Sequence, residues 1–146
     1  MKELYSEIEI QASDERVWKV LTDFASFPQW NPFIRRVIGE AQEGQRLKVY
    51  IQPSGADSIT FRPTILKVEP NRELRWLGNF FMPGLFDSEH IFTIETLSEN
   101  SVRFVQWEIF KGKFVPLFAD RLDKDTKRGF EEMNYALKAQ AEQNNF

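Results

Sequence analysis

The apolar residues of this sequence change their spacing once, and that change constrains the fold more than any other feature. Residues 33–111 indicate successive short strands, which turn-forming residues interrupt at 43–44, 53–57, 70–71, 82–84 and 98–100. From Pro116 onward the apolar residues recur at steps of three and four, which is typical of one face of a helix. We therefore expect an antiparallel meander of about six strands, followed by one long helix over 116–142.

One strand and a short helical pair are expected before this meander. Residues 4–10 alternate apolar with polar side chains, as in a half-buried strand. Ser13 is the expected N-cap of a helix whose first turn carries acidic residues, and Pro28 and Pro32 permit one further helical turn at most. Together these elements predict an α+β domain whose sheet curls around the last helix.

Composition limits the class of protein. The length of 146 residues fits a single domain over 1–146, and 42% hydrophobic with 28% charged residues is the balance of a soluble globular chain. The 14 Phe, 4 Trp and 3 Tyr must line something dry, either a core or a cavity. A net charge of -3 without a basic run gives no electrostatic support for binding nucleic acid.

Missing residue types exclude several kinds of chemistry. The chain has no Cys, and His90 is its single histidine, so thiolate sites and sites with two imidazoles are excluded. The glycines never form a nucleotide-binding spacing, and no cofactor is expected. No apolar run approaches the roughly 18 residues of a spanning helix, so stable membrane insertion is not expected. The first ten residues resemble neither a signal nor a transit peptide, and a cytoplasmic location is the simplest expectation.

Short motifs extend over nearly the whole chain: ASDERVW at 12–18, WNPF at 30–33, RELRW at 72–76, PGLF at 83–86, EH at 89–90, GF at 129–130 and MN at 133–134. Their combination in this order resembles the SRPBCC superfamily, which includes polyketide cyclase-like, START-like and pollen-allergen proteins. The resemblance implies a helix-grip fold, in which a seven-stranded antiparallel sheet grips a long C-terminal helix and a ligand cavity lies between them. It implies less about chemistry, because this fold hosts carriers, receptors and some enzymes.

The inward face of two strands can be predicted from the sequence. In residues 85–95 the even-numbered side chains are mostly apolar and the odd-numbered ones mostly polar. A three-residue loop over 98–100 would pair Leu97 with Ser101 and keep this parity in the next strand, 102–110. Even-numbered residues would then face inward on both strands, with Ile94 opposite Phe104, Phe92 opposite Gln106 and His90 opposite Glu108.

This register predicts a polar trio, His90, Gln106 and Glu108, in an aromatic wall. An isolated buried carboxylate is costly, so Glu108 should be paired with His90, neutralised or reached by water. Pairing would raise the pKa of His90 and lower that of Glu108, whereas burial would do the opposite, and the sequence leaves the direction open. The predicted ligand-binding residues are Trp76, His90, Phe92, Phe104, Gln106, Glu108, Phe110, Phe130 and Met133.

The odd-numbered residues of the same strands would form an apolar strip on the outer face. Ile91 should lie opposite Trp107, and Thr93 opposite Val105, with Ile109 beside them. A strip of this kind is typical of a contact surface, and one interpretation is a homodimer through Ile91, Trp107 and Ile109. A covering loop is the other interpretation.

Three functions are compatible with these patterns. The first is binding of a small hydrophobic ligand (a lipid, an isoprenoid or a polyketide-like compound), with the polar trio orienting an oxygen-bearing end. The second is an enzyme resembling polyketide cyclases or aromatases, with His90 and Glu108 as the candidate catalytic acid and base. The third is a regulatory or interaction module that uses the outer strip. A metal site is disfavoured, because His90 and Glu108 supply only two ligands.

Three further features have two interpretations each. Asn31, before a proline, is expected to form a turn, although it could point into the cavity mouth. Residues 80–86 form an unusually apolar turn, which we interpret as the lip of the cavity; folding onto the closing helix is the alternative. Gly129 costs about 1 kcal/mol within a helix, so it should allow close approach to the sheet or leave space for a ligand.

Overall fold

The computed structural model describes residues 1–53 and 55–143, and within them eight strands form two antiparallel sheets. The larger sheet has the order β1-β8-β7-β6-β5, and the smaller has the order β2-β3-β4. The strands of the larger sheet are β1 (Lys2–Ile10), β5 (Thr64–Glu69), β6 (Glu73–Phe80), β7 (Phe86–Ser98) and β8 (Ser101–Lys111). Those of the smaller sheet are β2 (Ile34–Ile38), β3 (Lys48–Ile51) and β4 (Ile59–Phe61).

The chain has one strand more than the seven expected, because the segment before the 70–71 turn is divided. The sequence pattern predicted a single strand there, but β4 ends at Phe61 and β5 begins at Thr64. Pro63 lies between them and cannot donate a backbone hydrogen bond to a sheet ladder. Its carbonyl oxygen instead accepts a hydrogen bond from the backbone N of Leu47 at 2.8 Å. The chain passes from the smaller sheet to the larger one at this point.

The helical pair after β1 is confirmed. It consists of α1 (Asp14–Thr22), a single 3-10 turn η1 (Phe24–Ser26) and the short α2 (Phe27–Trp30). Ser13 is the N-cap of α1, since its side chain accepts a hydrogen bond from the backbone N of Arg16 at 3.1 Å.

The closing helix differs from the uninterrupted α-helix expected over 116–142. It comprises a 3-10 turn η2 (Val115–Phe118), a turn of α-helix α3 (Ala119–Arg121), a π-helical turn η3 (Leu122–Thr126) and α4 (Lys127–Glu142). Leu122 and Phe130 are both buried. In a regular α-helix, however, two residues eight positions apart would point in directions that differ by about 80° around the helix axis, because eight residues make more than two full turns. The wider π-turn takes up this excess and returns Leu122 to the buried face.

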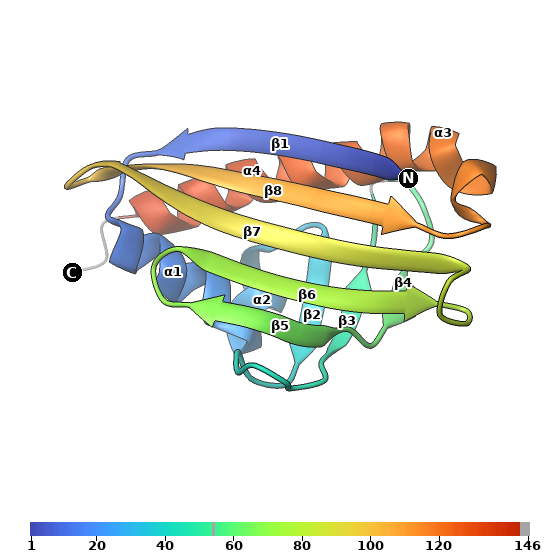
Figure 1. Ribbon diagram of the computed structural model, residues 1–146. Coiled ribbons are helices and arrows are strands. Elements are labelled where there is room, and N and C mark those ends of the chain that lie inside the picture. The colour runs from blue at the N-terminus through green and yellow to red at the C-terminus, as the bar shows by residue number, and fades with distance from the viewer. Residues whose placement is uncertain (54, 144–146) are drawn as a thin grey trace.

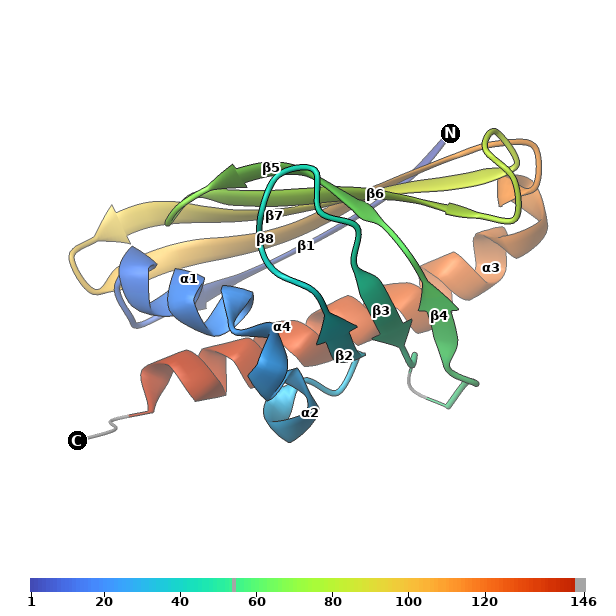
Figure 2. The ribbon, with the colours of Figure 1, turned by 90° about the horizontal axis from the view of Figure 1, so that it is seen from below.

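The core lies between the larger sheet and the closing helix. Figure 2 shows the five-stranded sheet on one side and α4 on the other, with α1, α2 and the smaller sheet beside the helix. Figure 1 shows the opposite face of the larger sheet, which no helix covers. The predicted α+β arrangement, a curled antiparallel sheet with a long C-terminal helix, is therefore confirmed. In the described part of the chain, no helix is long and apolar enough to cross a membrane.

Candidate functional site

The register of β7 and β8 is the one predicted. His90 lies opposite Glu108, and Phe92 lies opposite Gln106. The turn differs in detail, because Ser98 pairs with Ser101 across two loop residues and the register shifts between Thr96 and Ser98. A two-residue loop with a bulge beside it shifts the register by the same amount as a three-residue loop. The even-numbered residues of both strands therefore still face inward, as predicted.

All nine predicted ligand-binding residues are buried, with exposed fractions between 0% and 6%. They come from three strands and the closing helix, and therefore meet in the layer between the larger sheet and α4. They are Trp76 from β6, His90 and Phe92 from β7, Phe104, Gln106, Glu108 and Phe110 from β8, and Phe130 and Met133 from α4.

The aromatic rings of this layer are in contact with one another. The His90 imidazole stacks on Phe92, with ring centroids 4.0 Å apart and an interplanar angle of 12°. The Trp76 ring meets Phe92 edge-on at 5.1 Å, and Phe130 lies 5.1 Å from His90. A ligand could enter this layer only if the rings that are now in contact moved apart.

A chain of hydrogen bonds fixes the protonation of His90. Gln106 Nε2 lies 3.3 Å from the carbonyl oxygen of Phe130 and 2.8 Å from Asn134 Oδ1. Because a carbonyl oxygen can only accept, the amide nitrogen of Gln106 must face α4 and its oxygen must face His90. His90 Nε2 lies 2.9 Å from that oxygen and therefore carries the proton. The other ring nitrogen, Nδ1, is left as an acceptor in the neutral imidazole.

The polar cluster includes three residues that the sequence prediction missed. Asn134 Nδ2 donates to Ser6 Oγ at 3.0 Å, which joins β1 to α4 beneath Gln106. Ser88 Oγ donates to Glu108 Oε2. Strand parity already places Ser88 among the inward even-numbered residues, although not in the predicted polar trio, and it could have found Ser6 in the same way. Asn134 follows Phe130 by one helical turn.

Burial dominates the electrostatics of the Glu108 and His90 pair. Glu108 Oε1 lies 3.5 Å from His90 Nδ1, inside the protein. Burial raises the pKa of Glu108 from 4.5 to about 7, against the opposing hydrogen bond from Ser88. Burial also lowers the pKa of His90 from 6.5 to about 3, against the opposing hydrogen bond with Gln106. Near neutral pH the pair is thus a neutral imidazole beside a carboxyl group that is close to its midpoint.

Within residues 1–53 and 55–143, two buried donors have no protein partner. Trp76 Nε1 faces the interior without an acceptor, and Trp76 is only 1% exposed. Asn31 Nδ2 is also unpartnered, although Asn31 Oδ1 accepts from the backbone N of Phe33 at 3.0 Å and of Ile34 at 2.9 Å. Those two hydrogen bonds confirm the predicted turn-forming role of Asn31. A buried donor without an acceptor is costly, and both groups could bind an oxygen atom.

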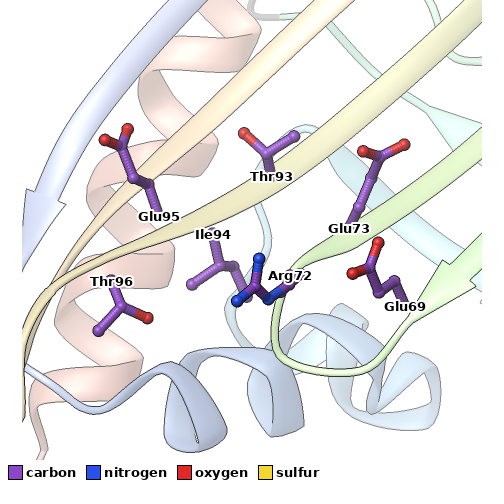
Figure 3. Close-up of a pocket in the computed structure, with 7 residues that line it drawn as sticks. All are labelled: Glu69, Arg72, Glu73, Thr93, Ile94, Glu95 and Thr96. Carbon is purple, nitrogen blue, oxygen red and sulfur yellow. The ribbon is translucent and has the colours of Figure 1, made fainter.

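A pocket of about 410 Å³ lies away from this cluster, at the turn between β5 and β6 and along β7 (Figure 3). None of the nine predicted ligand-binding residues lines it. Its lining is Glu69, Arg72, Glu73, Thr93, Ile94, Glu95 and Thr96. In the residues that the structure describes, no group of three or more His, Asp or Glu is placed to hold a metal ion.

The outer strip is less exposed than predicted. Ile91 pairs with Trp107 as expected, but Ile91 is 3% exposed and Val105 is also buried. Arg75 lies opposite Ile91 on β6 and forms ion pairs with Glu73 at 2.9 Å and Glu89 at 3.0 Å on this face. Trp107, at 37%, remains exposed, while Ile109 is half-buried. The homodimer through Ile91, Trp107 and Ile109 stays a prediction, and Trp107 would supply most of its contact.

Comparisons with known proteins agree with this fold. The family model described as polyketide cyclase / dehydrase and lipid transport matches residues 1–142. A START superfamily protein from Mycobacterium smegmatis is 22% identical, with a TM-score of 0.77 and 97% of each chain covered. The Zhui aromatase/cyclase from a Streptomyces species is 18% identical, with a TM-score of 0.74 and 97% and 93% of the two chains covered. Norcoclaurine synthase from Thalictrum is 16% identical, with a TM-score of 0.73 and 96% and 93% covered. A search of curated proteins gave no significant match.

Proposed function

Because the chain belongs to the polyketide cyclase/dehydrase and lipid transport family, we propose that it binds a small hydrophobic ligand between the five-stranded sheet and α4. The observation that carries this proposal is the unpartnered Nε1 of buried Trp76, within an aromatic wall that also holds His90 and Glu108. The rings would bury the apolar part of the ligand, at about 25 cal/mol per Å² of apolar area. The Trp76 N–H would donate to an oxygen of the ligand.

The donor groups of Trp76 and Glu108 restrict the chemical class of the ligand. Trp76 Nε1 can only donate, and a protonated Glu108 can donate as well. An isolated anion would be costly in this apolar layer. A lipid, isoprenoid or polyketide-like molecule with a carbonyl or ether oxygen therefore fits better than a hydrocarbon or a charged compound. Its entry requires the contacting rings of the layer to separate.

The test compares a long-chain methyl ketone with the alkane of the same length, using calorimetry or native mass spectrometry. We expect the ketone to bind about tenfold more tightly, because it satisfies the buried donor. Trp76→Phe should abolish this preference while the alkane still binds. Trp18→Phe, on α1, is the matched control and should keep the preference. If the wild-type protein binds neither compound nor any other apolar ligand, the proposal is wrong.

A second candidate function is an acid-base enzyme of the cyclase or aromatase type. It is favoured by one observation, namely that Glu108 has a pKa of about 7 and lies beside the free Nδ1 of neutral His90. Glu108, which is near its midpoint at neutral pH, would take a proton from carbon as the carboxylate and give one to the substrate oxygen as the acid, with neutral His90 positioning its carboxyl group, as an aldol closure or dehydration requires. His90→Ala and Glu108→Ala should abolish turnover in an enzyme but only weaken binding in a carrier. Turnover that survives both changes would exclude this candidate.

A further inference from the structure

The smaller sheet turns one face to the core and the other face to solvent. One row of paired residues across β2, β3 and β4 is buried, and it consists of Val37, Val49 and Phe61. Successive residues of a strand point to opposite faces of a sheet. The next row therefore points outward, and it consists of Arg36, Tyr50 and Thr60. In Figure 2 no helix lies in front of β3 and β4, so this outward face is open.

Cations gather around the ring of Tyr50 on the outward face. Arg36 Cζ lies 6.0 Å from the centroid of the Tyr50 ring, and Lys48 Nζ lies 5.4 Å from it. A hydrogen bond from Lys48 and the charges of Lys48, Arg36 and Arg62 lower the pKa of Tyr50, although burial opposes them. The charged groups that act on this hydroxyl are thus all cations. We call Arg36, Lys48, Tyr50 and Arg62 the basic face.

The cations of the basic face are not neutralised by the protein itself. Within residues 1–53 and 55–143, Arg36, Lys48 and Arg62 form no ion pair. The sequences of β2, β3 and β4 contain neither Asp nor Glu. On the larger sheet, by contrast, Lys67, Arg75 and Arg103 each form ion pairs with glutamates. Like charges held together repel, and a bound anion would relieve this repulsion.

Acidic residues near the basic face lie in the connecting loops and do not outnumber the cations. They are Glu40, Glu43 and Asp57. The carboxylate of Glu43 accepts a hydrogen bond from the backbone N of Val68, on the larger sheet, at 3.0 Å. Residues 31–63 hold five Lys and Arg against three Asp and Glu, whereas the rest of the chain holds 14 against 19. The smaller sheet is therefore a positive region on a chain that is negative elsewhere.

We propose that the basic face binds a short acidic segment of a partner protein. Arg36 and Arg62 would each hold a carboxylate through paired N–H donors, and Lys48 would act as a point charge. The Tyr50 hydroxyl would donate a hydrogen bond to a carboxylate oxygen. The charge complementarity would speed the encounter and select the partner. The proposal does not depend on any ligand between the larger sheet and α4.

The size and charge of the basic face favour a protein segment over a nucleic acid. Strands of five, four and three residues cover roughly 10 by 15 Å, which fits a short segment. Proteins that bind nucleic acid through its backbone typically contact about 6–10 phosphates, more than three cations supply. A long polyanion would also meet the acidic excess of the rest of the chain.

The experiment is fluorescence anisotropy with labelled octaglutamate, compared with octaglutamine and with octathymidylate. We expect the wild-type protein to bind octaglutamate at about 50 mM salt, more weakly as salt is added, and octaglutamine not at all. The triple variant Arg36→Gln, Lys48→Gln and Arg62→Gln should bind octaglutamate about tenfold more weakly or less. Nitrogen-15 NMR of the wild-type protein should show shifts on β2, β3 and β4 when octaglutamate is added.

The matched control removes the same amount of charge from other surfaces. It combines Lys19→Gln, Lys111→Gln and Lys113→Gln, at three exposed positions outside the smaller sheet, and should weaken binding less than about twofold. Circular dichroism should show that both triple variants are folded. The proposal is overturned if the two variants lose binding equally, or if the wild-type protein does not bind octaglutamate. Tighter binding of octathymidylate that only the basic-face variant loses would assign the basic face to nucleic acid and also overturn the proposal.

Discussion

Gly129 of α4 lies against the ring of Phe33, so that a β-carbon at position 129 would overlap the Cδ1 and Cε1 atoms of that ring. Of the two roles expected for this glycine, close approach is therefore the one that the structure supports. The contact is with the residue that precedes β2. The ring of Phe33 also packs edge-on against Phe130, with centroids 5.6 Å apart. α4 can pack this closely against Phe33 only because position 129 has no side chain.

We expect Gly129→Ala to lower the free energy of unfolding by about 1–3 kcal/mol, since overpacking outweighs the roughly 1 kcal/mol gain in helix propensity. Urea denaturation measures this change. Adding Phe33→Leu should recover part of the loss, so that the double variant is less destabilised than the sum of the single variants. A more stable Gly129→Ala protein would show that the contact with Phe33 is not limiting.

Glu108→Gln should change the pH dependence of stability. The folded pKa of about 7 lies above the ordinary 4.5, so the folded protein binds more protons than the unfolded chain between these values. The stability that protonated Glu108 contributes is therefore complete below about pH 4.5 and is lost as pH rises through 7. The glutamine mimics the protonated acid and should stabilise the protein by about 3 kcal/mol near pH 8, with little effect near pH 4. Glu95→Gln, at an exposed site, is the control; a difference between Glu108→Gln and wild type that does not vary with pH would contradict the burial of a carboxyl group.

Because His90 is the only histidine in the sequence, its protonation state can be measured without overlapping signals from other imidazoles. Burial lowers the pKa of His90 to about 3, so the folded protein binds fewer protons than the unfolded chain between pH 3 and 6.5. The stability that neutral His90 contributes is complete above pH 6.5 and is lost as pH falls toward 3. Nitrogen-15 NMR should show a neutral ring protonated at Nε2 and no titration between about pH 5 and pH 7. A midpoint near 6.5, or a proton on Nδ1, would refute the hydrogen-bond chain through Gln106.

Gln106→Leu should be strongly destabilising, by about 2–4 kcal/mol, because it leaves His90 Nε2 and Asn134 Oδ1 buried without partners. Thermal or urea denaturation checks this value. Gln11→Leu, at an exposed position, is the matched control and should change stability little. Combining Gln106→Leu with Asn134→Leu should cost less than the sum of the two single changes, since each removes a partner of the other.

Phe81→Asn should stabilise the fold, because asparagine tolerates the φ of 69° that Phe81 adopts. We expect the free energy of unfolding, measured by urea denaturation, to rise by about 1 kcal/mol. Asn71 also has a positive φ, of 68°, and Asn71→Gly should change stability by much less. If Phe81→Asn destabilises the protein, the contact between Phe81 and Phe114 matters more than the backbone strain.

Sequence periodicity determined the order of the elements and the inward face of β7 and β8. Alternation with period two is a local property, and a short turn sets the register of a hairpin, so His90 could be placed opposite Glu108 without a structure. The cap at Ser13 and the turn at Asn31 were likewise predictable, because each depends on backbone groups within three residues.

Tertiary structure decided the remaining features of the fold and the site, because these features depend on contacts between elements that are far apart in the chain. Periodicity does not show that the chain changes sheets at Pro63, nor that Arg75 covers the outer face at Ile91. The bond between Ser6 and Asn134 joins the first strand to the last helix. The pKa directions of Glu108 and His90 depend on the desolvation that all these elements produce together. Local pattern specified which side chains face inward, whereas packing decided which groups they meet and which charges they can hold.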